Sequence, residues 1–183
     1  IAVGFGRTGT LFACEQAGGT VAAIADFICL SKGITGGYLP LSCVLTRDEI
    51  YAAFYDDATA RGFLHSHSYT GNPLACRAAL AVLDLFEQDR VIEANRAKAA
   101  RFTELLDEVA AHPRIRHFRH TGMIWAFDVA DAAPDFADAF HRRALEKGVF
   151  IRPIGNSVYF MPPYVIEEPE MRLLAETTLA CLS

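Results

Sequence analysis

A single lysine, Lys32, stands where a short apolar stretch ends and a glycine-rich turn begins. Residues 27–30 read FICL and residues 33–37 read GITGG, which predicts a buried strand followed by a turn. A lysine amine that is removed from water favours its neutral form, and a neutral amine is a nucleophile that can form a Schiff base with a carbonyl compound. The pattern is also typical of a lysine whose head group stays in solvent at a strand end.

Hydroxyl side chains form a second candidate group just before a predicted helix. Residues 65–73 read HSHSYTGNP, in which Asn72 is a favoured N-cap and the following proline a favoured first helical residue. A helix N-terminus preceded by hydroxyl groups suits a phosphate, so Ser66 and Ser68 are of interest. His65 and His67 share one face of an extended segment, but no third metal ligand lies nearby in sequence, and we predict no metal site.

A glycine loop near the start of the chain admits another interpretation. Residues 4–9 read GFGRTG, which matches the G-x-G-x-x-G pattern of dinucleotide-binding loops. That function requires a helix directly after the glycines, and residues 10–19 leave little room for one because they contain a further glycine pair. A structural loop is favoured. A nucleotide-binding or purely scaffolding domain that uses Gly4–Gly9 is the non-enzyme alternative.

Composition limits the class of protein and its partners. The chain has 183 residues, of which 52% are hydrophobic and 21% charged, which is typical of a well-cored globular protein. The net charge of -5 without a basic cluster argues against nucleic-acid binding, and no apolar run is long enough to predict a membrane span. The five cysteines are scattered and have apolar neighbours, which indicates reduced, mostly buried thiols in a cytoplasmic protein.

The apolar pattern predicts the remaining elements. Strands are expected at 1–3 and 42–46, at two runs within 115–129 on either side of Gly122, and at 149–151 and 157–161. Helices are expected over 47–55, from 73 into the eighties, across 91–109, around 136–144, and from Pro169 to 182, where the apolar stripe is typical of core packing. The polar break at 87–90 is a candidate boundary between a domain of residues 1–88 and an α+β domain of residues 89–183.

Taken together, these segments resemble the class III, fold-type I aminotransferases that depend on pyridoxal 5'-phosphate. Residues 4–9 resemble the loop after the family's cofactor-binding aspartate, residues 32–33 its Schiff-base lysine motif, and residues 71–73 the turn after its phosphate contact. The resemblance implies an α/β fold. Residues 1–88 would be the C-terminal part of the large cofactor-binding domain, and residues 89–183 the small C-terminal α+β domain.

The resemblance also assigns roles to residues of the first domain. Lys32 would hold the cofactor and then move a proton between substrate and cofactor. Ser68 stands where the family usually has a threonine that contacts the cofactor phosphate, typically from the partner subunit, which implies a homodimer with shared active sites. Ser66 would be a substrate contact, although the family commonly reads Gly-Pro-Thr where this chain reads Ser-His-Ser.

Roles in the second domain follow from the same resemblance. Arg152 would bind a substrate carboxylate, and Tyr159 would line the substrate pocket. Residues 11–15, 72–76, 151–155 and 159–164 resemble the branch of the class that aminates 8-amino-7-oxononanoate to 7,8-diaminononanoate in biotin biosynthesis, with S-adenosylmethionine as amino donor. An ω-amino acid or acetylornithine aminotransferase is the alternative within the class.

The resemblance finally implies that part of the active site lies outside this sequence. The aspartate that pairs with the pyridine nitrogen of the cofactor would precede Ile1, as would the glycine–serine phosphate loop and the aromatic residue that stacks on the ring. We therefore expect this chain to be the C-terminal part of the enzyme and to be inactive on its own.

Overall fold

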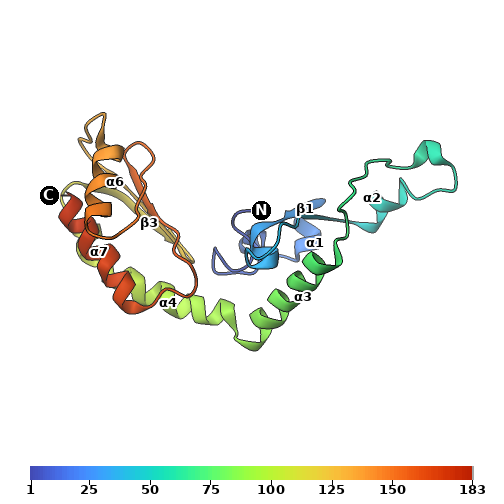
Figure 1. Ribbon diagram of the computed structural model, residues 1–183, viewed down its shortest axis with the longest axis horizontal. Coiled ribbons are helices and arrows are strands. Elements are labelled where there is room, and N and C mark those ends of the chain that lie inside the picture. Colours follow the sequence, from blue (N-terminus) through green and yellow to red (C-terminus); the bar gives the residue numbers. More distant parts are fainter. Residues whose placement is uncertain (183) are drawn as a thin grey trace. The chain divides into compact units, whose positions relative to one another are not determined.

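The structure, a computed structural model, describes residues 1–182, apart from the side chain of Ala22. The described residues form two compact units, Ile1–Ile92 and Glu93 onward, which are shown with their elements in Figure 1. The units divide within helix α4 (Val91–Leu105), a few residues beyond the polar break at 87–90. Each unit is described below by itself.

The first unit is built around a two-stranded antiparallel ribbon. Strand β1 (Phe27–Leu30) pairs with β2 (Cys43–Thr46), so that Phe27 lies opposite Thr46 and Leu30 opposite Cys43. The predicted strand at 42–46 is thereby confirmed. The other elements of this unit are the 3-10 helices η1 (Ala13–Ala17), η2 (Lys32–Thr35) and η3 (Thr59–Arg61) and the α-helices α1 (Val21–Ile24), α2 (Asp48–Ala52) and α3 (Pro73–Gln88).

Helix α3 begins where the sequence predicts. The Asn72 side chain accepts hydrogen bonds from the backbone N–H groups of Leu74, at 3.0 Å, and Ala75, at 3.4 Å, while Pro73 is the first helical residue. This cap satisfies two of the N–H groups that a helix start otherwise leaves free. The helix buries Ala79 on the side that contacts η2.

The ribbon is less buried than its apolar sequence suggests. Leu30 is the one buried residue of β1, and the Phe27 side chain is 57% exposed. A two-stranded ribbon has little material to cover both faces, so alternate residues stay exposed. Residues 1–3, for which a strand is expected, have no regular structure.

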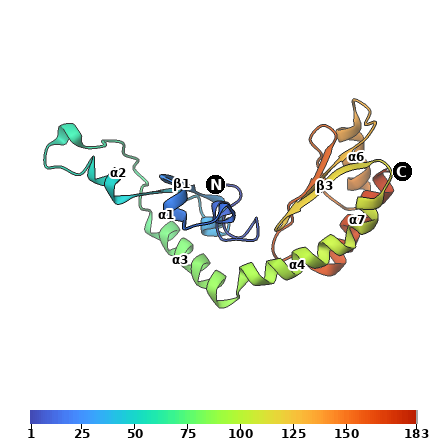
Figure 2. The same cartoon turned by 180° about the vertical axis from the view of Figure 1, so that it is seen from behind.

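The second unit contains a three-stranded antiparallel sheet in the order β3-β4-β5. Strands β3 (Ile115–Thr121) and β4 (Ile124–Val129) turn at Gly122, as predicted, and β5 (Ser157–Phe160) pairs with β4. The remaining elements of this unit are helices α4, α5 (Asp107–Ala111), α6 (Phe136–Glu146) and α7 (Glu168–Leu182). Figure 2 shows the same elements from behind.

This sheet and its helices enclose a continuous apolar core. Phe102 of α4 is fully buried and meets the ring of Trp125 edge-on, with 4.7 Å between ring centroids. The Trp125 indole N–H donates a hydrogen bond to the Thr103 hydroxyl at 2.9 Å, which satisfies the one polar group of that side chain. The predicted stripe on α7 is also core, because Met171 and Leu182 are buried.

The predicted strand at residues 149–151 is wrong. This segment bonds to helix α6 and not to the sheet. The Val149 N–H donates to the Ala144 carbonyl at 2.9 Å, and the His141 ring Nδ1 bonds to the Ile151 carbonyl at 2.8 Å. Because a helix takes up these backbone groups, the apolar run is an irregular extended segment.

The cysteines are less buried than predicted. Cys181 is buried, whereas Cys29 and Cys76 are exposed, and no disulfide joins any of the five. Cys29 lies on the exposed ribbon and Cys76 on the outer side of α3, which explains their exposure. Among the described helices, none is long and apolar enough to cross a bilayer.

Candidate functional site

Lys32 begins the turn that follows strand β1. The Ser31 hydroxyl donates to the Leu41 carbonyl at 2.9 Å, and the hydroxyl of Thr35, a residue only 1% exposed, donates to the Leu39 carbonyl at 2.5 Å. The two bonds close the loop between β1 and β2 on both sides of the lysine. The backbone around Lys32 is thus tied at two points.

The backbone of Lys32 itself has a left-handed conformation, with φ of +51°. A non-glycine residue in this region costs on the order of 1–3 kcal/mol and is usually held there by its surroundings. The surroundings here are the buried side chain of Ile34 on η2, which belongs to the same apolar cluster as Leu30 and Ala79. Backbone strain of this kind is concentrated at functional sites.

The Lys32 side chain is exposed within this chain. Among the described residues its amine has no hydrogen-bond or ion-pair partner. This unit therefore does not supply the desolvated environment that a buried strand would give to the amine. In this chain the Lys32 head group is accessible to solvent. The amine is accessible to a carbonyl compound.

Ser66 and Ser68 are also exposed, on the segment that leads from η3 into α3. Figure 1 shows the part of the unit around α2 and the segment after it extending away from the β1–β2 ribbon. Between described residues, no hydrogen bond joins Ser68 to the Lys32 turn. The chain therefore does not itself bring these two predicted contacts together.

The start of α3 is a weaker phosphate site than the sequence suggests. The Leu74 and Ala75 N–H groups already donate to Asn72, so a phosphate would depend on the serine hydroxyl groups. The neighbouring histidines serve local structure, since His67 Nδ1 accepts from the Tyr69 N–H at 3.2 Å and the His65 ring packs against Phe63. Within the described part of the chain, no three His, Cys, Asp or Glu side chains are grouped to hold a metal.

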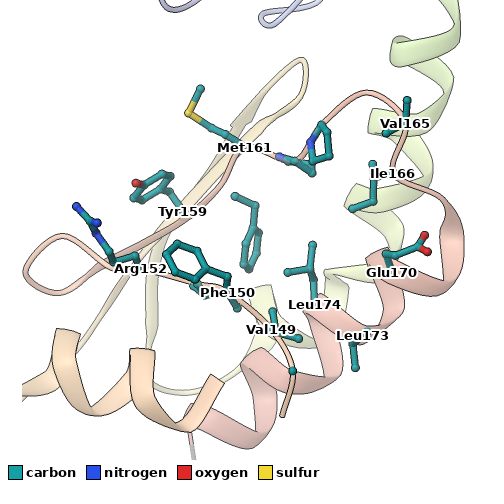
Figure 3. Close-up of a pocket in the computed structure, with 15 residues that line it drawn as sticks. Val149, Phe150, Arg152, Tyr159, Met161, Val165, Ile166, Glu170, Leu173 and Leu174 are labelled. Atoms are coloured by element: carbon teal, nitrogen blue, oxygen red, sulfur yellow. The ribbon is translucent and has the colours of Figure 1, made fainter. Parts of the chain in front are cut away.

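Arg152 and Tyr159 lie in the second unit, where both line a pocket of about 790 Å³. Figure 3 shows the two side chains at one end of this pocket and Glu170 at the other. The wall between them is largely apolar and includes Phe150, Met161, Val165, Ile166 and Leu174. A pocket of this size with few polar groups is typical of small-molecule sites.

The Arg152 guanidinium is free to take a ligand. Its side chain is exposed, and it makes no ion pair or hydrogen bond with any described residue. Arginine presents a planar fork that suits bidentate contact with a carboxylate. Tyr159 is half-buried on β5, whose neighbours Val158 and Phe160 are core residues. The sheet thus supports one side of the pocket.

The glycine loop does not have the structure that dinucleotide binding requires. Only a 3-10 helix, η1, follows it, and residues 18–19 end that helix. Phe5, the second residue of the loop, is 4% exposed and packs edge-on against Phe12 and Phe86. The loop therefore serves the core of the first unit. The nucleotide-binding alternative is not favoured.

Comparison with solved structures defines the class of protein. The chain superposes over its whole length on an adenosylmethionine-8-amino-7-oxononanoate aminotransferase from Methanocaldococcus jannaschii, with a TM-score of 0.90, 34% sequence identity and 44% of that chain covered. It also matches an amine transaminase from an uncultivated Pseudomonas species in the PLP-bound form, with a TM-score of 0.86, 28% identity and 43% of that chain covered. The fold is that of fold-type I aminotransferases.

Sequence comparison identifies the family. The model of the aminotransferase class-III family matches residues 1–182, and the chain belongs to that family. It is 45% identical over 178 residues to the adenosylmethionine-8-amino-7-oxononanoate aminotransferase of Helicobacter pylori and 41% identical over 189 residues to that of Aquifex aeolicus. The alignments cover 94% and 97% of this chain but only 40% of each relative. The chain therefore spans about 40% of the length of these curated relatives.

The residues present fit the cofactor of this family. Class III aminotransferases bind pyridoxal phosphate, and this chain supplies an accessible, unpaired amine at Lys32 and exposed hydroxyl groups at Ser66 and Ser68. Phe5 is a residue of interest that the motifs do not single out. The sequence predicts a structural loop there without naming a contact, and the only local signal is a large apolar residue between two glycines.

Proposed function

We propose that this chain is part of a pyridoxal-phosphate aminotransferase that transfers the amino group of S-adenosylmethionine to 8-amino-7-oxononanoate, giving 7,8-diaminononanoate for biotin biosynthesis. The relatives that bear this name match over nearly the whole chain, and the resemblance of residues 151–155 and 159–164 to the same branch supports the choice. Because the chain spans about 40% of those relatives, we propose that it acts within a longer polypeptide.

The observation that carries the proposal is the Lys32 turn. An accessible amine without a partner stands on a strained backbone that hydrogen bonds and a buried cluster hold in place. Backbone strain of this kind clusters at active sites. Because Arg90, His117 and Asp131 share the left-handed φ, the strain supports the assignment only together with the accessible amine. In the proposed enzyme, Lys32 is the residue that would hold the cofactor through its carbonyl carbon, and the same amine would serve as acid and base toward the substrate.

Each remaining candidate residue has a role in the proposed reaction. When bound, pyridoxal phosphate supplies an electron sink for the charge that develops on the substrate carbon. Lys32 Nζ would take the proton from the carbon of the amino donor that loses its amino group, and in the second half of the reaction would place a proton on the acceptor carbon that gains it. Arg152 binds the substrate carboxylate, Tyr159 forms a wall of the same pocket, and the Ser68 hydroxyl donates to the cofactor phosphate. Ser66 lies next to that contact as a substrate-binding candidate.

We further propose a cytoplasmic homodimer in which each subunit completes the site of the other. The support is the separation within this chain of Ser68 from the Lys32 turn. A phosphate contact supplied by Ser68 of a second copy would use both residues. Sedimentation of the complete polypeptide with bound cofactor tests this arrangement, and a fully active monomer would contradict it.

Borohydride reduction of the complete, cofactor-loaded polypeptide, followed by peptide mapping, tests the central assignment. We expect a stable cofactor adduct on Lys32 and none on Lys98 or Lys147, the other two lysines of the chain. An adduct on either of those lysines, with Lys32 unmodified, would overturn the proposal. Lys147 is the more stringent comparison because its side chain is exposed, whereas the Lys98 amine already donates to the Tyr164 carbonyl at 2.6 Å.

A panel of amino donors separates the proposed substrate from the alternative within the class. The complete enzyme is given S-adenosylmethionine, lysine, acetylornithine or an ω-amino acid, each with 8-amino-7-oxononanoate or with 2-oxoglutarate as acceptor. Formation of 7,8-diaminononanoate with S-adenosylmethionine supports the proposal. Transfer from acetylornithine or an ω-amino acid to 2-oxoglutarate, without diaminononanoate formation, would favour the alternative.

A further inference from the structure

Phe5 touches the residue that directly follows Lys32. A Cβ atom added to Gly33 would lie 2.9 Å from both Cβ and Cδ2 of Phe5, which is closer than carbon atoms pack. The φ angle of Gly33 is outside the left-handed region. Glycine is needed here because it lets the Phe5 side chain approach the backbone, and not because of its backbone freedom.

Phe5 has little room to move away from this contact. Its ring lies edge-on between Phe12 and Phe86, with ring centroids 5.9 and 6.2 Å away, and the residue is 4% exposed. Its backbone also has a left-handed φ of +56°. Packing thus restricts both the ring and the backbone of Phe5, so that Phe5 limits the movement of Gly33.

The contact adds to the local hydrogen bonds of the lysine turn, in which the Ile34 N–H donates to the Ser31 carbonyl at 3.3 Å and the Gly36 N–H to the Gly33 carbonyl at 3.1 Å. The Ser31 and Thr35 hydroxyl groups close the loop on either side of Lys32. Phe5 belongs to a separate segment of the chain and contacts Gly33, the residue immediately after the strained lysine. Phe5 and Lys32 are both non-glycine residues with a left-handed backbone, and Gly33 lies between them: it follows Lys32 in the chain and packs against Phe5.

We propose that Phe5 is a positioning residue for Lys32, which holds the left-handed lysine turn through its contact with Gly33 and so aims the amine. The inference rests on the proposed function, since it gives Lys32 a reaction in which its position matters. Catalytic side chains need to be held within about 0.5 Å of their working geometry, and a displacement of about 1 Å can cost on the order of 10²-fold in rate.

A double-mutant cycle in the complete, cofactor-loaded polypeptide tests this contact. The variants are Gly33→Ala, Phe5→Gly, which removes both the ring and the Cβ atom next to Gly33, and the combination of both. Leu11→Ala is the control, because Leu11 packs against the same cluster and is not among the atoms nearest to a Cβ placed on Gly33. Three quantities are measured: kcat and KM separately, the midpoint of the pH titration of the visible absorbance of the lysine-bound cofactor, and hydrogen exchange of the amides of residues 32–36.

We expect Gly33→Ala to lower kcat by roughly 10- to 100-fold with little change in KM, to move the absorbance midpoint and to speed amide exchange in the turn. Replacing Phe5 with glycine as well should recover about 10-fold of the lost kcat, because both the ring and the Cβ atom that the introduced methyl group would meet are then gone. Leu11→Ala should destabilise the unit but leave the midpoint unchanged.

Two results would overturn the inference: a Gly33→Ala enzyme with the wild-type midpoint and kcat, or a double variant whose losses simply multiply. If Gly33→Ala does not fold, recovery of soluble, loaded protein in the double variant supports the contact, and equal loss contradicts it. Failure of the proposed function looks different. The wild-type polypeptide would then show no cofactor absorbance and no adduct on Lys32, while the exchange measurements would still report on Phe5 and Gly33.

Discussion

The two units of this chain support their candidate residues in different ways. In the second unit, Arg152 and Tyr159 stand beside a complete core in which Phe102, Trp125 and Val158 are fully buried. In the first unit, the Lys32 turn rests on a small cluster around Phe5 and Ile34. Beside a large core, many contacts together hold a side chain in place, so the loss of one contact matters little. Beside a small cluster, a few specific contacts hold it, so the loss of one matters more.

The largest effect should follow the loss of Lys32, and it should be confined to chemistry. In the complete enzyme, Lys32→Ala is expected to lower kcat by about 10⁴-fold, the upper range for a lost general acid–base group. The fold should not suffer, because the side chain is exposed and the left-handed backbone gains nothing from it. Transamination rates and thermal unfolding check the two parts. Lys147→Ala, a change of another exposed lysine, is the control, and a similar loss there would refute the assignment.

A core substitution in the second unit should lower the stability of that unit, whereas loss of Lys32 should lower only the catalytic rate. Phe102→Ala removes a fully buried ring in contact with Trp125 and Phe160, and is expected to destabilise this unit by about 3–5 kcal/mol. The slowest-exchanging amides of β4 report the free energy of opening. Val165→Ala, at an 81% exposed side chain, should change it by less than about 0.5 kcal/mol. Equal effects of the two changes would show that the described core does not carry the stability.

Loss of the free arginine should affect substrate binding and leave the supporting core intact. Arg152→Ala is expected to raise KM for the carboxylate-bearing substrate by about 10- to 100-fold, the value of a charge-assisted hydrogen bond. Amide exchange in β5 should stay as in the wild type. Arg142→Ala, at an exposed arginine of α6, is the matched control. An unchanged KM for Arg152→Ala would show that Arg152 does not bind the substrate carboxylate and that this pocket is not part of the substrate site.

The smallest effect concerns an ion-pair cluster that ties α4 to α7. Hydrogen bonds from Arg101, and then from Arg172, lower the pKa of Glu168 from 4.5 to about 2. Because the folded pKa lies below the unfolded one, the pair stabilises the second unit above pH 4.5, and this contribution is lost as the pH falls from 4.5 toward 2. The groups are exposed, so the effect should be modest.

Glu168→Gln should therefore be slightly less stable than the wild type near neutral pH and equally stable near the lower end of that range. Denaturant unfolding at several pH values measures the difference. Glu176→Gln, at an exposed glutamate without an ion pair to any described residue, serves as control. A pH dependence that is the same in wild type and Glu168→Gln would show that the cluster contributes nothing.

Local elements of this chain were predictable because their signals act over a few residues. Asn72 and Pro73 mark the start of α3, and the spacing of Phe136, Phe140 and Ala144 marks the buried face of α6. The two strand-like runs on either side of Gly122 are confirmed as β3 and β4, with the turn at the glycine. Each signal is a helix cap, a hydrophobic period or a turn residue, and all of these are set by residues close together in the sequence.

The errors have the opposite cause. Residues 149–151 read as a strand, but His141 and Ala144 of α6 take up their backbone groups. Phe27 reads as buried, but the ribbon has nothing to cover it within its unit. In both cases the outcome depends on which distant element packs against the segment, and no local pattern carries that information.

The family, the candidate lysine and most regular elements can be inferred from the sequence, because motifs, caps and hydrophobic periods are properties of neighbouring residues. The exposure of Lys32 on a left-handed backbone, the unpaired Arg152 beside an apolar pocket and the contact of Phe5 with Gly33 are visible in the fold alone. Close approach and burial depend on packing between segments that lie far apart in the chain, which no local pattern specifies.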